Sequence, residues 1–215
     1  MKMDSLSKTA NRDLMAQARE SLRGRWGLAI GTFVVMQLIM IGVQMIPSVG
    51  GIGGLILTGP MSLGLVIFAL SLSRNQDPRL PQIFEGFQRF GVALGAYLLM
   101  VLFVCLWLLL LIIPGYIAIY AYSQIFYIIA EDANIGPLDA IRKSKEMMRG
   151  NKWKLFCLHL RFIGWALLCI LTFGIGFLWL APYMFISNAK FYDDLAHPAV
   201  MPEAEPATVE PPAQV

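Results

Sequence analysis

Three long stretches without a charged residue constrain this chain more than any other feature of its sequence. They run from Trp26 to Leu72, from Phe90 to Ala130 and from Phe162 to Ala189. A membrane-spanning helix needs about 20 mostly apolar residues to cross a hydrocarbon layer of about 30 Å. Each stretch is too long for one such helix and has about the length of two. The sequence therefore predicts six spans.

The composition agrees with a membrane location. Hydrophobic residues make up 57% of the 215 residues and charged residues 14%, whereas soluble domains carry about a quarter charged residues. The first apolar run follows 25 polar and charged residues and is longer than the apolar core of a signal peptide, so we expect it to be retained as the first span. Cys105, Cys157 and Cys169 lie in apolar segments without metal-like spacing, which favours neither a disulfide framework nor a zinc site.

Clusters of Gly and Pro mark the expected turns within these stretches, at 47–54, 114–115 and 174–176, because both residues break helices. We expect a cytoplasmic amphipathic segment over 1–25 and a six-helix membrane domain over 26–195. Residues 196–215 are rich in Pro and Glu and predict a disordered cytoplasmic tail. The expected spans are about 26–46, 55–73, 91–113, 115–130, 153–173 and 176–190.

A short amphipathic helix is expected before each pair of spans, at 9–24, from Pro81 and from Pro137. The predicted fold is therefore all-α: a polytopic membrane protein of six transmembrane helices, arranged as three hairpins that each follow an interfacial helix. The segment Glu20–Trp26 is similar to Glu146–Trp153, which indicates parallel internal repeats of two spans. Independent use of Arg, Gly and Trp at membrane edges explains the same match without a duplication.

Basic residues are distributed unevenly along the chain. The N-terminal segment carries six, the connector after the second span three, and the connector after the fourth span six when Lys154 is included. The turns between odd and even spans carry none. Because cytoplasmic loops collect Lys and Arg, both termini are expected in the cytoplasm. The expected interfacial anchors are Arg25 with Trp26 and Lys152 with Trp153.

Polar residues within the apolar stretches are the candidate functional residues. Arg161 either extends its long side chain to the inner headgroups or contacts an anion or a lipid phosphate in an inward-facing cavity. The other candidates are expected to hydrogen-bond between helices, with a pore lining as the alternative. They are Gln37, Gln44, Ser123, Gln124 and Asn188.

The sequence lacks the usual signatures of catalysis. It contains no nucleotide-binding loop, metal-ligand cluster or nucleophile–base motif, so we expect no catalytic residue, no metal and no cofactor. All fourteen acidic residues lie in segments expected in the cytoplasm. Proton-coupled transporters usually need carboxylates within the membrane. The sequence therefore argues against an enzyme and against a proton-coupled transporter.

Several blocks of sequence carry a family resemblance. They are Leu109–Gly115, Ala140–Gly150, Lys152–Trp153, Phe162–Trp165, Leu171–Trp179, Pro182–Tyr183, Ala189–Tyr192 and the N-terminal Ala18–Trp26. Together they resemble a family of bacterial integral membrane proteins catalogued as domain of unknown function 975. The resemblance implies a multi-span protein of the bacterial cytoplasmic (inner) membrane, and it implies no activity. Arg161 departs from the pattern, since a small polar residue is expected before Phe162.

These observations favour a non-enzymatic accessory, scaffold or envelope-maintenance component. The alternative is a channel or facilitator for a small solute, and a weaker one is a lipid-handling protein. The expected partners are the bilayer itself, in particular anionic lipids of the inner leaflet, which attract each nearby Lys or Arg by about 1 kcal/mol. A membrane-protein partner or a second copy of the chain is also expected, and nucleic acid is not.

Overall fold

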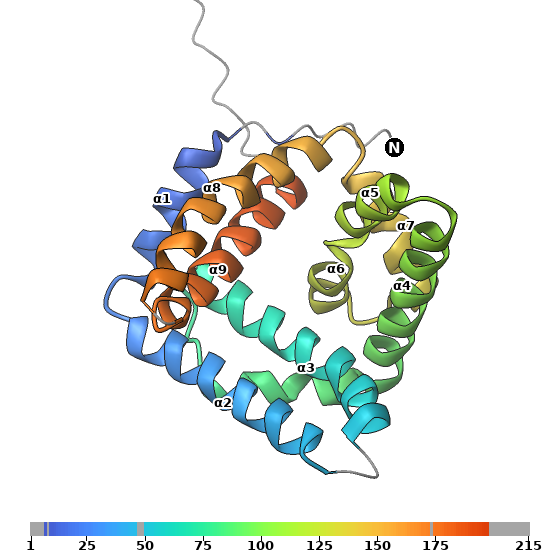
Figure 1. The fold of residues 1–215 in the computed structure, drawn as a ribbon, viewed down its shortest axis with the longest axis horizontal. Helices are drawn as coiled ribbons and strands as arrows, with labels where there is room; N and C mark the ends of the chain where they lie inside the picture. Colours follow the sequence, from blue (N-terminus) through green and yellow to red (C-terminus); the bar gives the residue numbers. More distant parts are fainter. Residues whose placement is uncertain (1–6, 8, 47–49, 173, 198–215) are drawn as a thin grey trace, which may run out of the picture.

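The structure is a computed structural model that describes residues 7, 9–46, 50–172 and 174–197. All regular secondary structure in these residues is helical (Figure 1). The helices are α1 (Asn11–Leu22), α2 (Trp26–Gln44), α3 (Gly50–Ser73), η1 (Leu80–Arg89), α4 (Phe90–Leu110), α5 (Ile112–Tyr122), α6 (Ile125–Glu131), α7 (Pro137–Met147), α8 (Lys152–Leu171) and α9 (Phe177–Ala196). Most of the predicted tail, from residue 198, and residues 47–49 of the first predicted turn lie outside this description.

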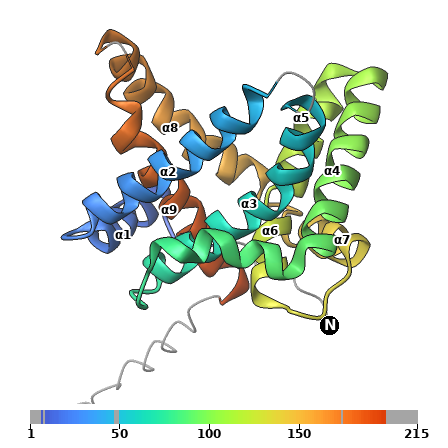
Figure 2. The ribbon, with the colours of Figure 1, turned by 90° about the horizontal axis from the view of Figure 1, so that it is seen from below.

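The long helices pack against their neighbours in the chain in three groups, which we refer to as hairpins: α2 with α3, α4 with α5 and α6, and α8 with α9. Figure 2 shows the ends of α2, α4 and α8 directed upwards, while α1, η1 and α7 lie in the lower half of the view. Each of these three shorter helices directly precedes one of these hairpins in the chain. The turns of the hairpins and the short helices therefore occupy opposite ends of the molecule.

The second arm of each hairpin is more buried than the first arm. In the most apolar part of α2 only 11% of residues are buried, against 67% in α3. The same contrast holds between the helix at Leu80–Leu110, with 11% buried, and the segment Ile112–Glu131, with 50%. Only 22% of α8 is buried, while α9 buries residues from Leu180 to Leu195. The core therefore lies where α3, α6 and α9 meet.

Five helical segments in the described ranges are long and apolar enough to cross a membrane. They are Trp26–Gln44, Gly53–Ser73, Leu80–Leu110, Ile112–Glu131 and Lys152–Leu171. α9 has the length, but Lys190, Asp193 and Asp194 lie towards its C-terminal end. The fold is therefore all-helical and typical of a membrane protein, with five segments that meet the length and composition of a span.

The first predicted turn is wrong in its extent. α3 begins at Gly50, so Gly50–Gly54 are helical instead of forming part of a turn. Each Gly in a helix interior costs about 1 kcal/mol relative to Ala. In an apolar environment, however, a backbone without internal hydrogen bonds costs more, so the helix continues through the glycines.

The second predicted turn is wrong in its position. The chain breaks at Leu111, which is extended with φ −163° and ψ 138°, whereas Pro114 and Gly115 lie in the first turn of α5. Pro fits there because its missing N–H would have no partner in a first helical turn. A Cβ at Gly115 would lie 2.4 Å from Cδ2 of Leu108, so this glycine permits the close approach of α4 and α5.

Two further boundaries differ from the predicted spans. The expected surface helix from Pro81 and the third span are continuous, because η1 runs directly into α4 at Phe90. The expected fourth span at 115–130 is interrupted after Tyr122, where α5 ends and a short α6 follows from Ile125. The residues at this interruption pack against α7, as described below.

The two similar sequence segments also have similar backbones. Gly24 follows α1 with φ +76°, and Gly150 follows α7 with φ +83°. Left-handed conformations of this kind are accessible to Gly at little cost and commonly end helices. In both places a long helix, α2 or α8, begins two residues later. The match between Glu20–Trp26 and Glu146–Trp153 therefore extends from sequence to local conformation.

Two glycines let α3 and η1 meet backbone to backbone. A Cβ at Gly64 would lie 1.9 Å from the carbonyl oxygen of Ile83, and a Cβ at Gly86 would lie 1.9 Å from that of Pro60. Neither distance is compatible with a side chain, so the two glycines permit direct contact between the backbones of α3 and η1.

We expect Gly64→Ala to lower the thermal stability of the purified protein in detergent. Overpacking of a tight contact costs typically about 1–3 kcal/mol. Here the added methyl group would collide with the backbone of Ile83, which cannot relieve the clash by a change of rotamer. Gly91→Ala is the matched control, because a Cβ at Gly91 in α4 would have no atom within 4 Å. Equal melting temperatures for the two variants would contradict the contact between α3 and η1.

Candidate functional site

The ends of the three buried hairpin arms meet in a group of charged residues. Arg74 follows α3 directly, Glu131 is the last residue of α6, and Asp193 lies near the end of α9. Arg74 donates to Asp193 Oδ1 from both Nε and Nη2, at 3.0 and 2.7 Å, and its Nη2 also donates to Glu131 Oε1. One guanidinium thus joins two carboxylates from two other hairpins.

Neighbouring side chains complete this group. The hydroxyl of Tyr192 donates to Glu131 Oε2 at 2.7 Å, and Ser73 Oγ donates to Asp193 Oδ2 at 3.2 Å. Lys190 Nζ donates to the carbonyl oxygen of Ser73. The ring of Tyr192 also stacks on that of Tyr127 in α6, with centroids 5.2 Å apart. We refer to Ser73, Arg74, Glu131, Lys190, Tyr192 and Asp193 as the Arg74 cluster.

The Arg74 cluster is partly shielded from solvent. The side chains of Arg74, Glu131 and Asp193 are 29%, 27% and 21% exposed, so their attraction is screened less than that of surface pairs. Burial opposes the charge of Arg74, but hydrogen bonds to Asp193 and Glu131 outweigh it and raise the pKa of the guanidinium. Burial and the hydrogen bond to Glu131 raise the pKa of the Tyr192 hydroxyl. Arg74 therefore stays charged, and Tyr192 stays a donor, throughout the physiological pH range.

Among the described residues, one group of side chains beside the Arg74 cluster has the composition of a metal site. The ligand atoms of Glu131, Asp193 and His197 lie within 4.8 Å of one another, next to a cavity of about 480 Å³ that Ser71, Gln76 and His197 help to line. Arg74, however, already pairs with both carboxylates, and its positive charge repels a second cation. The arrangement therefore acts as a junction of ion pairs, and it does not favour a metal centre.

The residues before α1 are tied to the third hairpin nearby. The backbone N–H of Ser7 donates to Asn151 Oδ1 at 3.0 Å, and Lys154 Nζ donates to the carbonyl oxygen of Ser7 at 2.8 Å. The hydroxyls of Ser7 and Thr9 donate to the carboxylate of Asp194. The N-terminal segment, the start of α8 and the end of α9 are therefore held together.

Two of the predicted polar residues, Ser123 and Gln124, lie at the break between α5 and α6. The backbone N–H of Gln124 donates to Ser144 Oγ at 3.3 Å, and Ser144 Oγ donates to the carbonyl oxygen of Ala121 at 2.8 Å. Gln124 Nε2 donates to Ser123 Oγ at 3.0 Å. The side chain of Gln124 is buried, and its Oε1 has no hydrogen-bond partner among the described residues. These contacts connect the break to α7.

The remaining predicted polar residues do not converge. Asn188 Oδ1 in α9 lies 3.1 Å from Nε2 of His159 in α8. Gln37 and Gln44 are exposed on α2, and the side chain of neither forms a hydrogen bond with a described residue. Arg161 is exposed on α8, and no carboxylate of the described chain pairs with it. Its role as an anion or lipid contact stays a prediction.

The predicted anchors occupy the starts of α2 and α8. Arg25 Nη1 donates to the carbonyl oxygen of Gln76 at 3.4 Å, and Lys152 is the first residue of α8. Trp153 is 72% exposed, and its ring stacks on Phe156 with centroids 5.1 Å apart. Trp26 lines a groove that is described below.

Sequence reasoning missed the Arg74 cluster, although a signal was available. Arg74 and Glu131 are the first charged residues after the second and fourth predicted spans, and Asp193 is the first acidic residue after the sixth. Even-numbered spans of three parallel hairpins end on the same side of the membrane. The sequence does not show which helices lie side by side, and this packing decides which of the charged residues at the helix ends become partners.

Comparison with known proteins adds the family. The family model described as "Protein of unknown function (DUF975)" matches residues 3–121 and 108–198. The chain belongs to this family. The match confirms the resemblance found in the sequence and covers almost all of the chain before its Pro- and Glu-rich end. No curated protein and no solved structure matches the chain.

We expect Arg74→Gln to destabilise this DUF975 protein by about 2 kcal/mol, between the values for exposed and for buried ion pairs. The change leaves the carboxylates of Glu131 and Asp193 close together without the guanidinium that joins them. Thermal unfolding in detergent measures the effect. Arg79→Gln is the control, because the Arg79–Asp77 pair is 71% and 73% exposed and contributes little. A loss that is no larger for Arg74→Gln than for Arg79→Gln would show that the cluster is not structural.

A double-mutant cycle separates the ion pair from general damage. If Arg74 and Asp193 interact directly, Asp193→Asn should cost less in an Arg74→Gln background than in the unchanged protein. The expected coupling is about 1 kcal/mol or more. Strictly additive losses in melting experiments would contradict the direct interaction.

Proposed function

We propose that this protein is a non-enzymatic accessory or scaffold component of the bacterial inner membrane. Its three hairpins form one unit that is closed at the cytoplasmic face by the Arg74 cluster. The outer arms α2, α4 and α8 then present apolar sides to lipid or to a membrane-protein partner.

The proposal rests on the contacts that the polar and charged residues make. Arg74, Glu131 and Asp193 form ion pairs with one another. The intramembrane polar residues are spread over α2, the α5–α6 break and α9, where the side chain of Asn188 contacts His159 of α8 and the backbone N–H of Gln124 donates to Ser144 of α7. Such a distribution stabilises helix packing and supplies no continuous polar surface for a solute.

The exposed apolar side chains support a protein that works through its surface. They cluster towards the turns of the hairpins, for example Leu109 and Leu110 at 88% and 69% exposed and Leu171 at 79%. Exposed apolar area of this kind is stable only against lipid or another protein. The channel reading has no comparable support among the described residues.

The proposed topology has six spans with both termini in the cytoplasm. α9 is the sixth span in this proposal, with Lys190, Asp193 and Asp194 at its cytoplasmic end, where charged residues reach the headgroup layer. The basic residues of α1, α7 and the start of α8 lie on the same side, as cytoplasmic segments should.

Cysteine labelling tests this orientation. In a background without Cys105, Cys157 and Cys169, a membrane-impermeant maleimide should label Ile175→Cys in intact cells, because Ile175 is 61% exposed at the α8–α9 turn. Ala133→Cys, in the exposed α6–α7 connector, should react only after permeabilisation. Labelling of Ala133→Cys in intact cells would overturn the proposed orientation.

The scaffold function is tested by crosslinking within native membranes, followed by gentle extraction and mass spectrometry of the tagged protein at its natural level. We expect a discrete membrane-protein partner in a fixed ratio. Recovery of the chain without such a partner, together with flux of a defined solute into liposomes that contain it alone, would replace the scaffold by the channel.

A further inference from the structure

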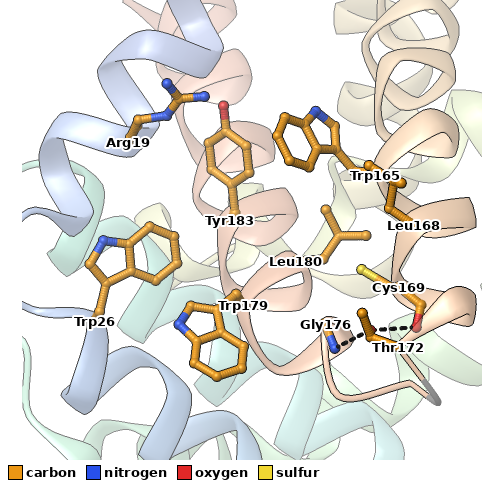
Figure 3. A pocket seen from close by; sticks show the side chains of 10 residues that line it. All are labelled: Arg19, Trp26, Trp165, Leu168, Cys169, Thr172, Gly176, Trp179, Leu180 and Tyr183. Carbon is orange, nitrogen blue, oxygen red and sulfur yellow. Dashed lines mark hydrogen bonds between the residues drawn. The ribbon is translucent and has the colours of Figure 1, made fainter.

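A groove between the first helices and the third hairpin combines three indole rings with one cation. Its volume is about 480 Å³, within the range of small-molecule sites. Figure 3 shows Trp26 from α2, Trp165 from α8 and Trp179 from α9 around it, with Arg19 of α1 at one end. We refer to it as the Trp groove; Leu168, Cys169, Thr172, Gly176, Leu180 and Tyr183 also line it.

Arg19 is a cation without an acidic partner in the described ranges. Its guanidinium carbon lies 5.8 Å from the centroid of the Tyr183 ring, the distance of a cation–π contact. The adjacent Glu20 pairs with Arg23 instead, at 3.6 Å. The guanidinium donors of Arg19 form no hydrogen bond with a described residue, so they remain available to an anion.

The walls of the Trp groove are apolar and partly uncovered. Trp165 and Trp179 are 52% and 50% exposed, whereas Tyr183 is buried. The hydroxyl of Tyr183 donates to the carbonyl oxygen of Met15 at 3.2 Å, which fixes the ring below Arg19. Indoles are suited to this position because they have a large apolar body and a single polar N–H.

The two ends of the Trp groove differ in their position relative to the proposed membrane. Ser21 Oγ donates to the carbonyl oxygen of Ser73 at 3.3 Å, so α1 ends beside the Arg74 cluster, at the face where the headgroups are proposed. From Tyr183 the groove follows α9 to Gly176, over about 10 Å at 1.5 Å per residue, towards the hairpin turn. Charge lies at one end and apolar surface at the other.

We propose that the Trp groove binds an anionic phospholipid, with its phosphate at Arg19 and an acyl chain along the indoles of Trp165 and Trp179. Charge complementarity selects the headgroup, and the apolar walls accept the chain. A bound lipid would fill the space between α1–α2 and the α8–α9 hairpin. This site goes beyond the scaffold function and does not depend on it.

Quenching of tryptophan fluorescence by brominated lipids tests the site. The chain has five tryptophans, and replacement of Trp107 and Trp153 by Phe leaves the three that line the groove. The protein is placed in nanodiscs of phosphatidylcholine that contain a small fraction of brominated phosphatidylglycerol or, in parallel, the same fraction of brominated phosphatidylcholine. We expect the anionic lipid to quench at about fivefold lower fraction, equivalent to about 1 kcal/mol for one basic side chain.

Variants assign the preference to Arg19. Arg19→Gln should abolish it, and Arg23→Gln should retain it, because Arg23→Gln removes the same charge just after the same helix, at a residue that does not line the groove. Raising the salt concentration should weaken the preference of the unchanged protein for the anionic lipid, since ions screen the charge of the headgroup. This measurement does not depend on the folding of a variant. Equal quenching by the two lipids, quenching by neither, or a preference that survives Arg19→Gln would overturn the proposal.

Discussion

The structure depends on the meeting of Arg74 with Asp193 and Glu131. These residues belong to three hairpins that are otherwise joined by apolar packing, which is weakly directional within lipid. A guanidinium with fixed N–H directions specifies which helix ends come together and in what orientation. The buried arms α3, α6 and α9 surround the same point, so the outer arms are positioned through them.

The Arg74 cluster also explains why charge is tolerated near the ends of these helices. A carboxylate at the edge of the hydrocarbon layer is costly unless it is paired. Arg74 pairs with Asp193 and Glu131 at once, and Tyr192 and Ser73 supply the remaining donors. The three partners are far apart in the sequence, and one hairpin supplies the cation while the other two supply the carboxylates.

Much of the fold could be predicted from the sequence, because its determinants are local. Uncharged stretches predict apolar helices, and Gly24 and Gly150 lie where an amphipathic helix gives way to a long one. Boundaries were less predictable. Pro114 suits a first helical turn as well as it suits a loop, and the glycines at 50–54 remain helical where water does not compete for the backbone.

The candidate sites were less predictable than the fold. Gln124 and Asn188 stand out in the sequence as polar residues in apolar surroundings; the side chain of Asn188 contacts His159 of a neighbouring helix, whereas Gln124 donates to α7 from its backbone N–H. Arg74 and Asp193 do not stand out, because many charged residues flank the spans and lateral packing alone decides which of them meet. Arg19 belongs to an ordinary amphipathic pattern, and its importance depends on Tyr183, which is 164 residues away.

The position of Asp193 has a consequence for biogenesis. Ribosomes synthesise the chain from its N-terminus, so Arg74 and Glu131 are made before their third partner, Asp193. The first two hairpins can associate through that single contact, and the assembly is completed only when the end of α9 emerges. Asp193 lies within the last tenth of the helical region before residue 197. A nascent chain that is truncated before this residue therefore lacks the Arg74–Asp193 ion pair. This missing ion pair gives quality-control proteases a physical basis for distinguishing the truncated chain from the finished protein.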